Sequence, residues 1–241
     1  MASKITFIPR NKIEAEAVKT LCDYCHKYGD IDRPPIPVEE ILESHLELKF
    51  GFANLSEKLN TPGVLGATWV LDRKVLIDET LDPVEHPRNE GRYRFTVAHE
   101  IGHWQLHSHI YLSQEKQMKL FDTEDQPSIV CRARDRKEPM EKQADIFAGY
   151  LLMPGEMIKK AWIEKYGKSE PYVAENEIGL LNARFGLGDD DNTPTVEIAR
   201  EIAGDFNVSG QAMQIRLIEM GLIQVKDQGP SIFDGGGVDA N

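Results

Sequence analysis

The side chains best suited to chemistry form one five-residue motif, His99-Glu100-Ile101-Gly102-His103, in this chain of 241 residues. Residues four apart on a helix lie on one face a turn apart, so both imidazoles can converge on a single ion. Glu100 lies beside them and can accept a proton from an attacking water molecule. This H-E-x-x-H arrangement is typical of zinc hydrolases, although two ordinary histidines beside an unrelated glutamate would give the same letters.

A catalytic zinc site needs a third protein ligand, and His109 is the first candidate. It follows His99 by ten residues, where the metzincin peptidases have their last histidine. That pattern requires a glycine at a turn, and this chain has Leu106 there. Because leucine does not easily adopt a positive φ, we expect the helix to continue and His109 to point away from the motif.

Glu141 is the stronger candidate for the third ligand. It lies in the first turn of a helix predicted from Pro139 to Met153, and Asp145 lies one turn later. Both carboxylates fall on or beside an apolar stripe, where an unpaired charge is costly. A metal ion would satisfy Glu141, and the N–H of a metal-binding imidazole would satisfy Asp145. Alternatively, Glu141 only stabilises the start of its helix, where acidic residues are favoured.

Hydrophobic periodicity predicts the elements that position these residues. We expect helices over 12–28, 38–46, 92–107, 139–153, 156–166, 173–185, 195–206 and 210–220, and strands over 46–52, 66–71 and 74–78. The last two strands should form a hairpin, which could offer an edge to an extended peptide or serve only the fold. The polar stretch from Ser113 to Lys137 has no clear period and is expected to be a surface insertion.

These elements predict an α+β fold that is mostly helical, with a small β-sheet. We expect a zinc metallopeptidase domain over residues 1–187, a helix-turn-helix-like region over 193–224 and a disordered tail over 225–241. In the second region, Ser209 is a suitable N-cap for the second helix. A DNA reader would place several lysines or arginines on that helix, which here offers Arg216 and Glu219.

Composition opposes DNA and membrane partners. The chain has 28 Lys+Arg against 40 Asp+Glu, a formal net charge of −12, so we do not expect direct DNA binding. No apolar run is long enough for a membrane span or a secretory signal, which predicts a cytoplasmic protein. Residues 22–26 match the haem-attachment pattern C-x-x-C-H, which requires export, and a zinc site there lacks a second cysteine pair because Cys131 stands alone.

The chain resembles the ImmA/IrrE metallopeptidases in several segments. The first motif extends from Phe95 to His103, and the second is Glu141-x-x-Ala-Asp145 followed by Phe-Ala-x-x-Leu-Leu-Met-Pro154. Further similarity lies in residues 34–41, 206–209 and 215–222, so the resemblance covers roughly residues 12–223. The stretch between His109 and Glu138 departs from the pattern and leaves the shape of the substrate cleft open.

The resemblance implies a zincin-like core in which His99, His103 and Glu141 bind zinc, Glu100 is the general base and Asp145 orients a ligand. Mn²⁺ or Fe²⁺ could replace Zn²⁺, because imidazole and carboxylate accept several divalent ions. Members of this family cleave or inactivate helix-turn-helix repressors in stress, phage or mobile-element circuits. The alternative is a regulatory protein that sequesters a repressor without cleaving it, although a pure binder would not need Glu100.

The residue that would stabilise the oxyanion stays open. By residue type, the candidates are Tyr150, Tyr172 and His107. His107 lies one turn beyond His103, where packing or support of a ligand is as reasonable as chemistry.

Overall fold

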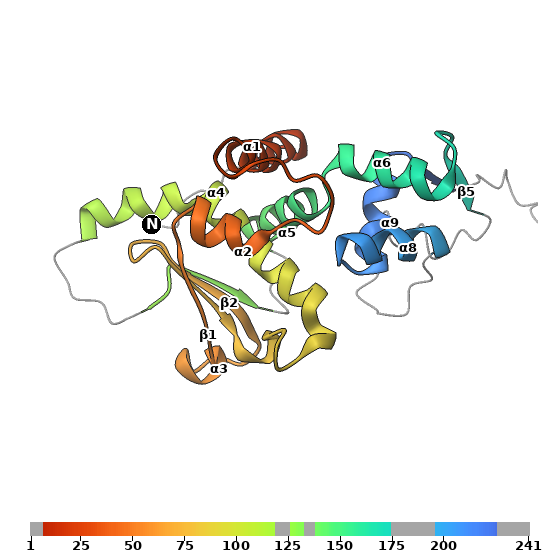
Figure 1. Cartoon of the computed structure of the whole chain (residues 1–241). Coiled ribbons are helices and arrows are strands. Elements are labelled where there is room, and N and C mark those ends of the chain that lie inside the picture. Colours follow the sequence, from red (N-terminus) through yellow and green to blue (C-terminus); the bar gives the residue numbers. More distant parts are fainter. Residues whose placement is uncertain (1–6, 119–125, 133–137, 175–195, 226–241) are drawn as a thin grey trace, which may run out of the picture.

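The computed structural model describes residues 7–118, 126–132, 138–174 and 196–225. Its larger part has three layers, which Figure 1 shows from top to bottom. Helix α1 (Arg10–Tyr28) forms the first, α4 (Glu90–Met118) and α5 (Pro139–Leu152) form the second, and a four-stranded sheet forms the third. This mostly helical α+β architecture confirms the predicted fold class.

The sheet has the strand order β1-β3-β2-β4. Its strands are β1 (Lys49–Ala53), β2 (Val64–Trp69), β3 (Lys74–Asp78) and β4 (Ile129–Arg132). The predicted hairpin exists as antiparallel β2 and β3, but β1 pairs with its β3 side and β4 with its β2 side. The hairpin therefore has no free edge, and the expectation that it could receive a peptide is wrong. In the described sheet, the edge strands are β1 and β4.

Close packing of α4 on α5 forms the centre of the core. Val97, Ala98 and Ile101 of α4 are fully buried, as are Phe147 and Leu151 of α5. Periodic apolar residues on each helix supply these contacts, as amphipathic helices do.

The glycine inside the H-E-x-x-H motif allows this close approach. A side chain at Gly102 would place its Cβ 3.1 Å from the backbone oxygen of Ala144, tighter than most real contacts. Gly102 therefore lets the two helices come close enough for residues on α4 and α5 to meet.

Helix α4 is longer than its predicted extent of 92–107, because it continues to Met118. Residues 113–118 are mostly good helix formers without an apolar face, so periodicity did not detect them. Strand β4 also lies within the stretch expected to be a surface insertion, and it extends the sheet. That expectation is wrong for β4, whose Ile129 and Cys131 are buried. Residues 119–125 and 133–137 lie outside the described part of the chain.

A smaller group of elements lies at one end of the molecule (Figure 1). It contains α6 (Gly155–Tyr166), α8 (Glu197–Phe206), α9 (Gly210–Glu219) and a two-stranded parallel sheet of β5 (Tyr172–Ala174) and β6 (Ile223–Val225). The helix predicted from residue 173 is wrong over Val173 and Ala174, which belong to β5. The rest of that prediction, 175–185, and the tail from 226 lie outside the described residues.

The remaining described elements are short. They are α2 (Val38–Glu40), a π-helix (Ile41–His45), α3 (Leu55–Lys58) and two 3₁₀ turns (Glu79–Leu81 and Pro87–Asn89). Among the described helices, none has the length and apolar character needed to cross a membrane.

The helix-turn-helix-like pair α8–α9 packs against the larger part of the molecule. Ser209 caps α9 as predicted, because its hydroxyl accepts a hydrogen bond from the backbone N–H of Ala212. Arg216 of α9 is buried, pairs with Glu14 of α1 at 2.6 Å and lies 4.4 Å from the ring centre of Tyr150. This arginine therefore holds α9 on the core and is not presented to a nucleic acid.

Candidate metal centre

Two histidines of α4 and one glutamate of α5 converge inside the molecule. His99 and His103 lie one helical turn apart with their ring centres separated by 4.6 Å. Their Nε2 atoms lie 3.3 and 3.0 Å from the two carboxylate oxygens of Glu141. All three side chains are buried, and their ligand atoms lie within 4.8 Å of one another.

This arrangement fits a divalent metal ion. Neither Nε2 atom has a hydrogen-bond partner among the described residues, although both are buried. Buried nitrogens without partners are costly in a folded protein, and a metal ion at this point would satisfy both. Two imidazoles and one carboxylate also match the ligand set of a common class of catalytic zinc sites.

Glu100 points from α4 toward β2 and is fully buried. The hydroxyl of Thr68 donates a hydrogen bond of 2.6 Å to its Oε2, whereas its Oε1 has no partner among the described residues. Burial raises the pKa of Glu100, while the two histidines and the Thr68 hydrogen bond oppose that change. A side chain at Gly66 would overlap Oε1, so only glycine leaves room for this carboxylate.

Cys131, Asp145 and Glu141 set the electrostatics around His99. The Nδ1–H of His99 donates to Oδ1 of Asp145 over 2.9 Å, which leaves Nε2 facing Glu141. Burial lowers the pKa of His99, but Cys131, Asp145 and Glu141 together outweigh burial and raise the pKa. Burial raises the pKa of Glu141, but the closely approaching rings of His103 and His99 outweigh burial and lower the pKa to about 2. The two histidines therefore favour the ionised form of the Glu141 carboxylate.

On its other ring nitrogen, His103 contacts a row of hydrogen-bonding side chains. Nδ1 of His103 is 3.1 Å from Nδ1 of His107, and Nε2 of His107 is 2.9 Å from Oε1 of Gln143. Burial lowers the pKa of His107 to about 4. Gln143 was not identified as a site residue from the sequence. The one feature that could have indicated it is its position as a polar residue on the buried face of α5.

Cys131 of β4 also belongs to the centre. Its thiol lies within 4.8 Å of ligand atoms of His99 and Glu100, and burial raises its pKa. Cys131 was expected only to lack a partner cysteine, and the pairing of β4 with β2 places its thiol beside two residues of α4 instead. No spacing in the sequence could indicate this contact, since the two segments meet only through the tertiary fold.

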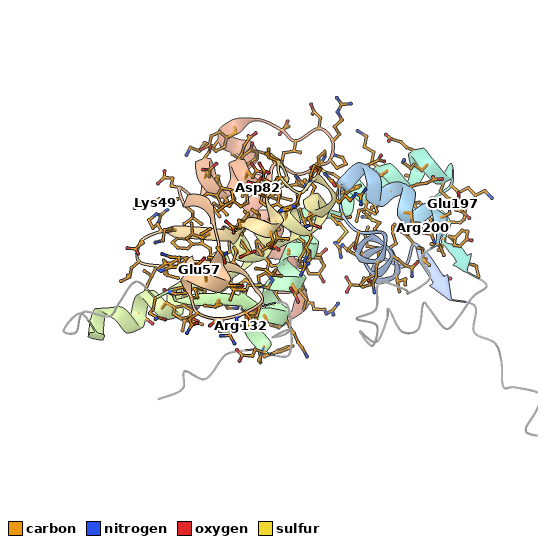
Figure 2. All side chains as sticks on the ribbon, turned by 90° about the horizontal axis from the view of Figure 1, so that it is seen from below. Lys49, Glu57, Asp82, Arg132, Glu197 and Arg200 are labelled. Atoms are coloured by element: carbon orange, nitrogen blue, oxygen red, sulfur yellow. The ribbon has the colours of Figure 1, made fainter. Side chains whose placement is uncertain are left out.

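A pocket opens onto His99 between α4, α5 and the end of the sheet. Arg92 and Arg132 are exposed residues at this pocket, and Figure 2 shows Arg132 in the larger part of the molecule, away from Glu197 and Arg200 of α8. The lining residues are Leu65, Arg92, Phe95, Thr96, His99, Cys131, Arg132, Glu141 and Asp145. The candidate centre is thus accessible from one side.

Several other candidates from the sequence lie elsewhere. His109 is exposed on the continuing helix α4, as expected. Tyr150 packs against Arg216, and Tyr172 packs against Tyr166, so neither tyrosine lines the pocket. His107 does not line it either, because it lies behind His103.

Comparison with known proteins identifies the family of the chain. No curated protein matches the chain. A peptidase family described as the IrrE N-terminal-like domain matches residues 85–217, which is more than half of the chain. The matched segment includes both helices of the candidate centre. The predicted resemblance is confirmed: the chain belongs to the peptidase M78 family of IrrE N-terminal-like metallopeptidases.

Proposed function

We propose that this protein is a zinc-dependent endopeptidase in which His99, His103 and Glu141 bind the metal and Glu100 is the general base. The convergence of both Nε2 atoms on the Glu141 carboxylate, with Glu100 beside them, is the observation that supports this most strongly. Bound zinc would polarise the scissile carbonyl and make water a better nucleophile. Mn²⁺ and Fe²⁺ accept the same imidazole and carboxylate ligands, so the identity of the metal as zinc is itself part of the proposal.

The geometry around Glu100 suits transfer of a proton from water to the leaving amine. Thr68 occupies Oε2 and fixes the carboxylate, while Oε1 stays free to accept a proton. Such a group is typically worth about 10²–10⁴ in rate. Asp145 holds the ring of His99 and so acts as a positioning residue for that ligand.

The substrate that we propose is a helix-turn-helix repressor, and family membership supports it. An extended segment of the repressor could pair with β4, which is an edge strand of the described sheet and contributes Cys131 and Arg132 to the pocket. Since repressors act on DNA inside the cell, we propose a cytoplasmic location for the reaction.

Purified helix-turn-helix repressors, incubated with the zinc-loaded protein and followed by intact-mass analysis, test the proposal. We expect two fragments whose masses sum to that of the repressor plus water, and no fragments with a chelator or with Glu100→Gln. Stable complexes of intact repressor with both the zinc-loaded native protein and Glu100→Gln would instead support sequestration. Cleavage that survives the chelator would contradict a metal-dependent reaction.

A further inference from the structure

Three buried side chains form a continuous hydrogen-bonded chain behind the candidate metal centre. His103 and His107 lie one turn apart on α4, and Gln143 reaches them from α5. Their exposed fractions are 0%, 2% and 5%, so water cannot easily replace any of these contacts. We call this set the His103–His107–Gln143 relay.

The position of each hydrogen in the relay follows from which atoms can donate. Oε1 of Gln143 only accepts, so Nε2 of His107 must hold a hydrogen. Two ring nitrogens 3.1 Å apart share one hydrogen, either on Nδ1 of His103 or on Nδ1 of His107. A hydrogen on Nδ1 of His107 would make that ring a buried cation without a carboxylate in contact, which is unfavourable. The shared hydrogen therefore belongs to His103.

We propose that His107 and Gln143 are positioning residues that fix His103 in the tautomer whose Nε2 faces the metal centre. With its hydrogen on Nδ1, His103 presents a lone pair at Nε2 beside Glu141. The inference rests on the proposed function in taking His103 as a ligand of a zinc ion. The hydrogen positions themselves follow from the contacts.

The relay differs from the support given to the other histidine. Nδ1–H of His99 donates to the carboxylate of Asp145, which can only accept. This contact therefore allows a single arrangement of hydrogens on the His99 ring. The relay allows a second arrangement of hydrogens, because rotation of the Gln143 amide exchanges its acceptor oxygen for its donor NH₂. If Gln143 turned its NH₂ group toward His107, the hydrogens would shift along the relay and place one on Nε2 of His103. A protonated nitrogen cannot bind a metal ion, so the orientation of Gln143 decides whether His103 is a ligand.

The first test reads the tautomers directly, without substrate. Long-range ¹H–¹⁵N spectra of histidine-labelled full-length protein distinguish the two neutral tautomers and the cation. The protein has seven histidines. The control variant is His109→Ala, which changes an exposed histidine on the same helix. Before and after zinc addition, we expect His107 as the neutral Nε2–H form and His103 with its hydrogen on Nδ1. His107 with a hydrogen on Nδ1 would overturn the inference.

The second test compares two substitutions of similar size at position 143. Gln143→Glu keeps an acceptor for His107, whereas Gln143→Leu removes it. In competition with a chromophoric chelator, we expect Gln143→Leu to bind Zn²⁺ about 10- to 100-fold more weakly, as is usual when the support of a metal ligand is lost. Gln143→Glu should retain most of the affinity, and thermal melts would show whether both variants are folded.

The outcomes separate this inference from the proposed function. Equal zinc affinity in folded Gln143→Leu and native protein would contradict the role of the relay while leaving peptidase activity possible. Expected tautomers and affinities without cleavage of any repressor would instead contradict the proposed substrate. If Gln143→Leu does not fold, the tautomer spectra of the native protein still decide the matter.

Discussion

The hydroxyl of Thr68 donates a 2.6 Å hydrogen bond to the buried carboxylate of Glu100, and this bond connects the sheet to the candidate metal centre. Thr68 belongs to β2, 32 residues before Glu100 in α4. The contact occupies one carboxylate oxygen and leaves the other without a partner among the described residues. The sheet thus has a direct role in the site, because it orients the proposed base.

Thr68→Val tests this role by removing the hydroxyl with little change in shape. Losing a hydrogen bond to a charged group costs about 1.5–3 kcal/mol, which corresponds to roughly 10- to 100-fold in kcat/KM if the bond persists in the transition state. Zinc affinity should stay close to that of the native protein. Thr68→Ser keeps the hydroxyl and should recover most of the activity. Full activity in Thr68→Val would show that Glu100 does not need this support.

Glu100→Gln removes the proposed base without changing the size of the side chain. We expect turnover to fall by about 10²–10⁴ while the zinc content of the protein is retained, because position 100 is not one of the three proposed ligands. Repressor cleavage followed by mass spectrometry and zinc analysis of the same sample measure both effects. Cleavage at the native rate would falsify the general-base role.

Gly66→Ala should disturb the site through a steric clash. The added Cβ would lie 2.9 Å from the carboxylate carbon of Glu100, so the buried carboxylate must move. Overpacking of this kind typically costs about 1–3 kcal/mol of unfolding free energy. Gly51→Ala is the matched control in β1, because its Cβ would meet only Leu76 at 3.5 Å. Urea unfolding and cleavage assays should show losses for Gly66→Ala alone, and equal behaviour of the two variants would refute the steric account.

Metal removal should lower the stability of the folded protein. Zinc that binds only the native state stabilises it by RT ln(1 + [Zn²⁺]/Kd), or about 4 kcal/mol at a thousandfold excess over Kd. Thermal melts should therefore shift upward when Zn²⁺ is added to chelator-treated protein, whereas Mg²⁺, which prefers oxygen ligands, should have little effect. The shift should disappear in Glu141→Ala. A zinc-dependent shift of native size in that variant would place the metal elsewhere.

The sequence was most informative where chemistry depends on local spacing. His99 and His103 are neighbours on one helix, and Glu141 with Asp145 repeats the same four-residue interval on α5, so helical geometry alone made both pairs visible. The structure brings these four side chains together. The hairpin β2–β3 was predicted for the same reason, since its two strands are adjacent in the chain.

Residues that reach the site through the tertiary fold could not be found in this way. Thr68, Cys131 and Gln143 come from β2, β4 and α5, and each contacts a residue of α4 that is at least 32 positions away. Strand β4 has four residues, too few for a periodic pattern, and it lies in a polar stretch. Its pairing with β2 is what places Cys131 beside His99 and removes the free edge of the hairpin.

The central claim is that His99, His103 and Glu141 together hold one zinc ion. Anomalous diffraction from crystals of the zinc-loaded protein, measured on both sides of the zinc absorption edge, tests it most directly. We predict one strong peak about 2.0–2.2 Å from Nε2 of both histidines and from a carboxylate oxygen of Glu141. A peak bound elsewhere, or none between these three side chains, would contradict the claim.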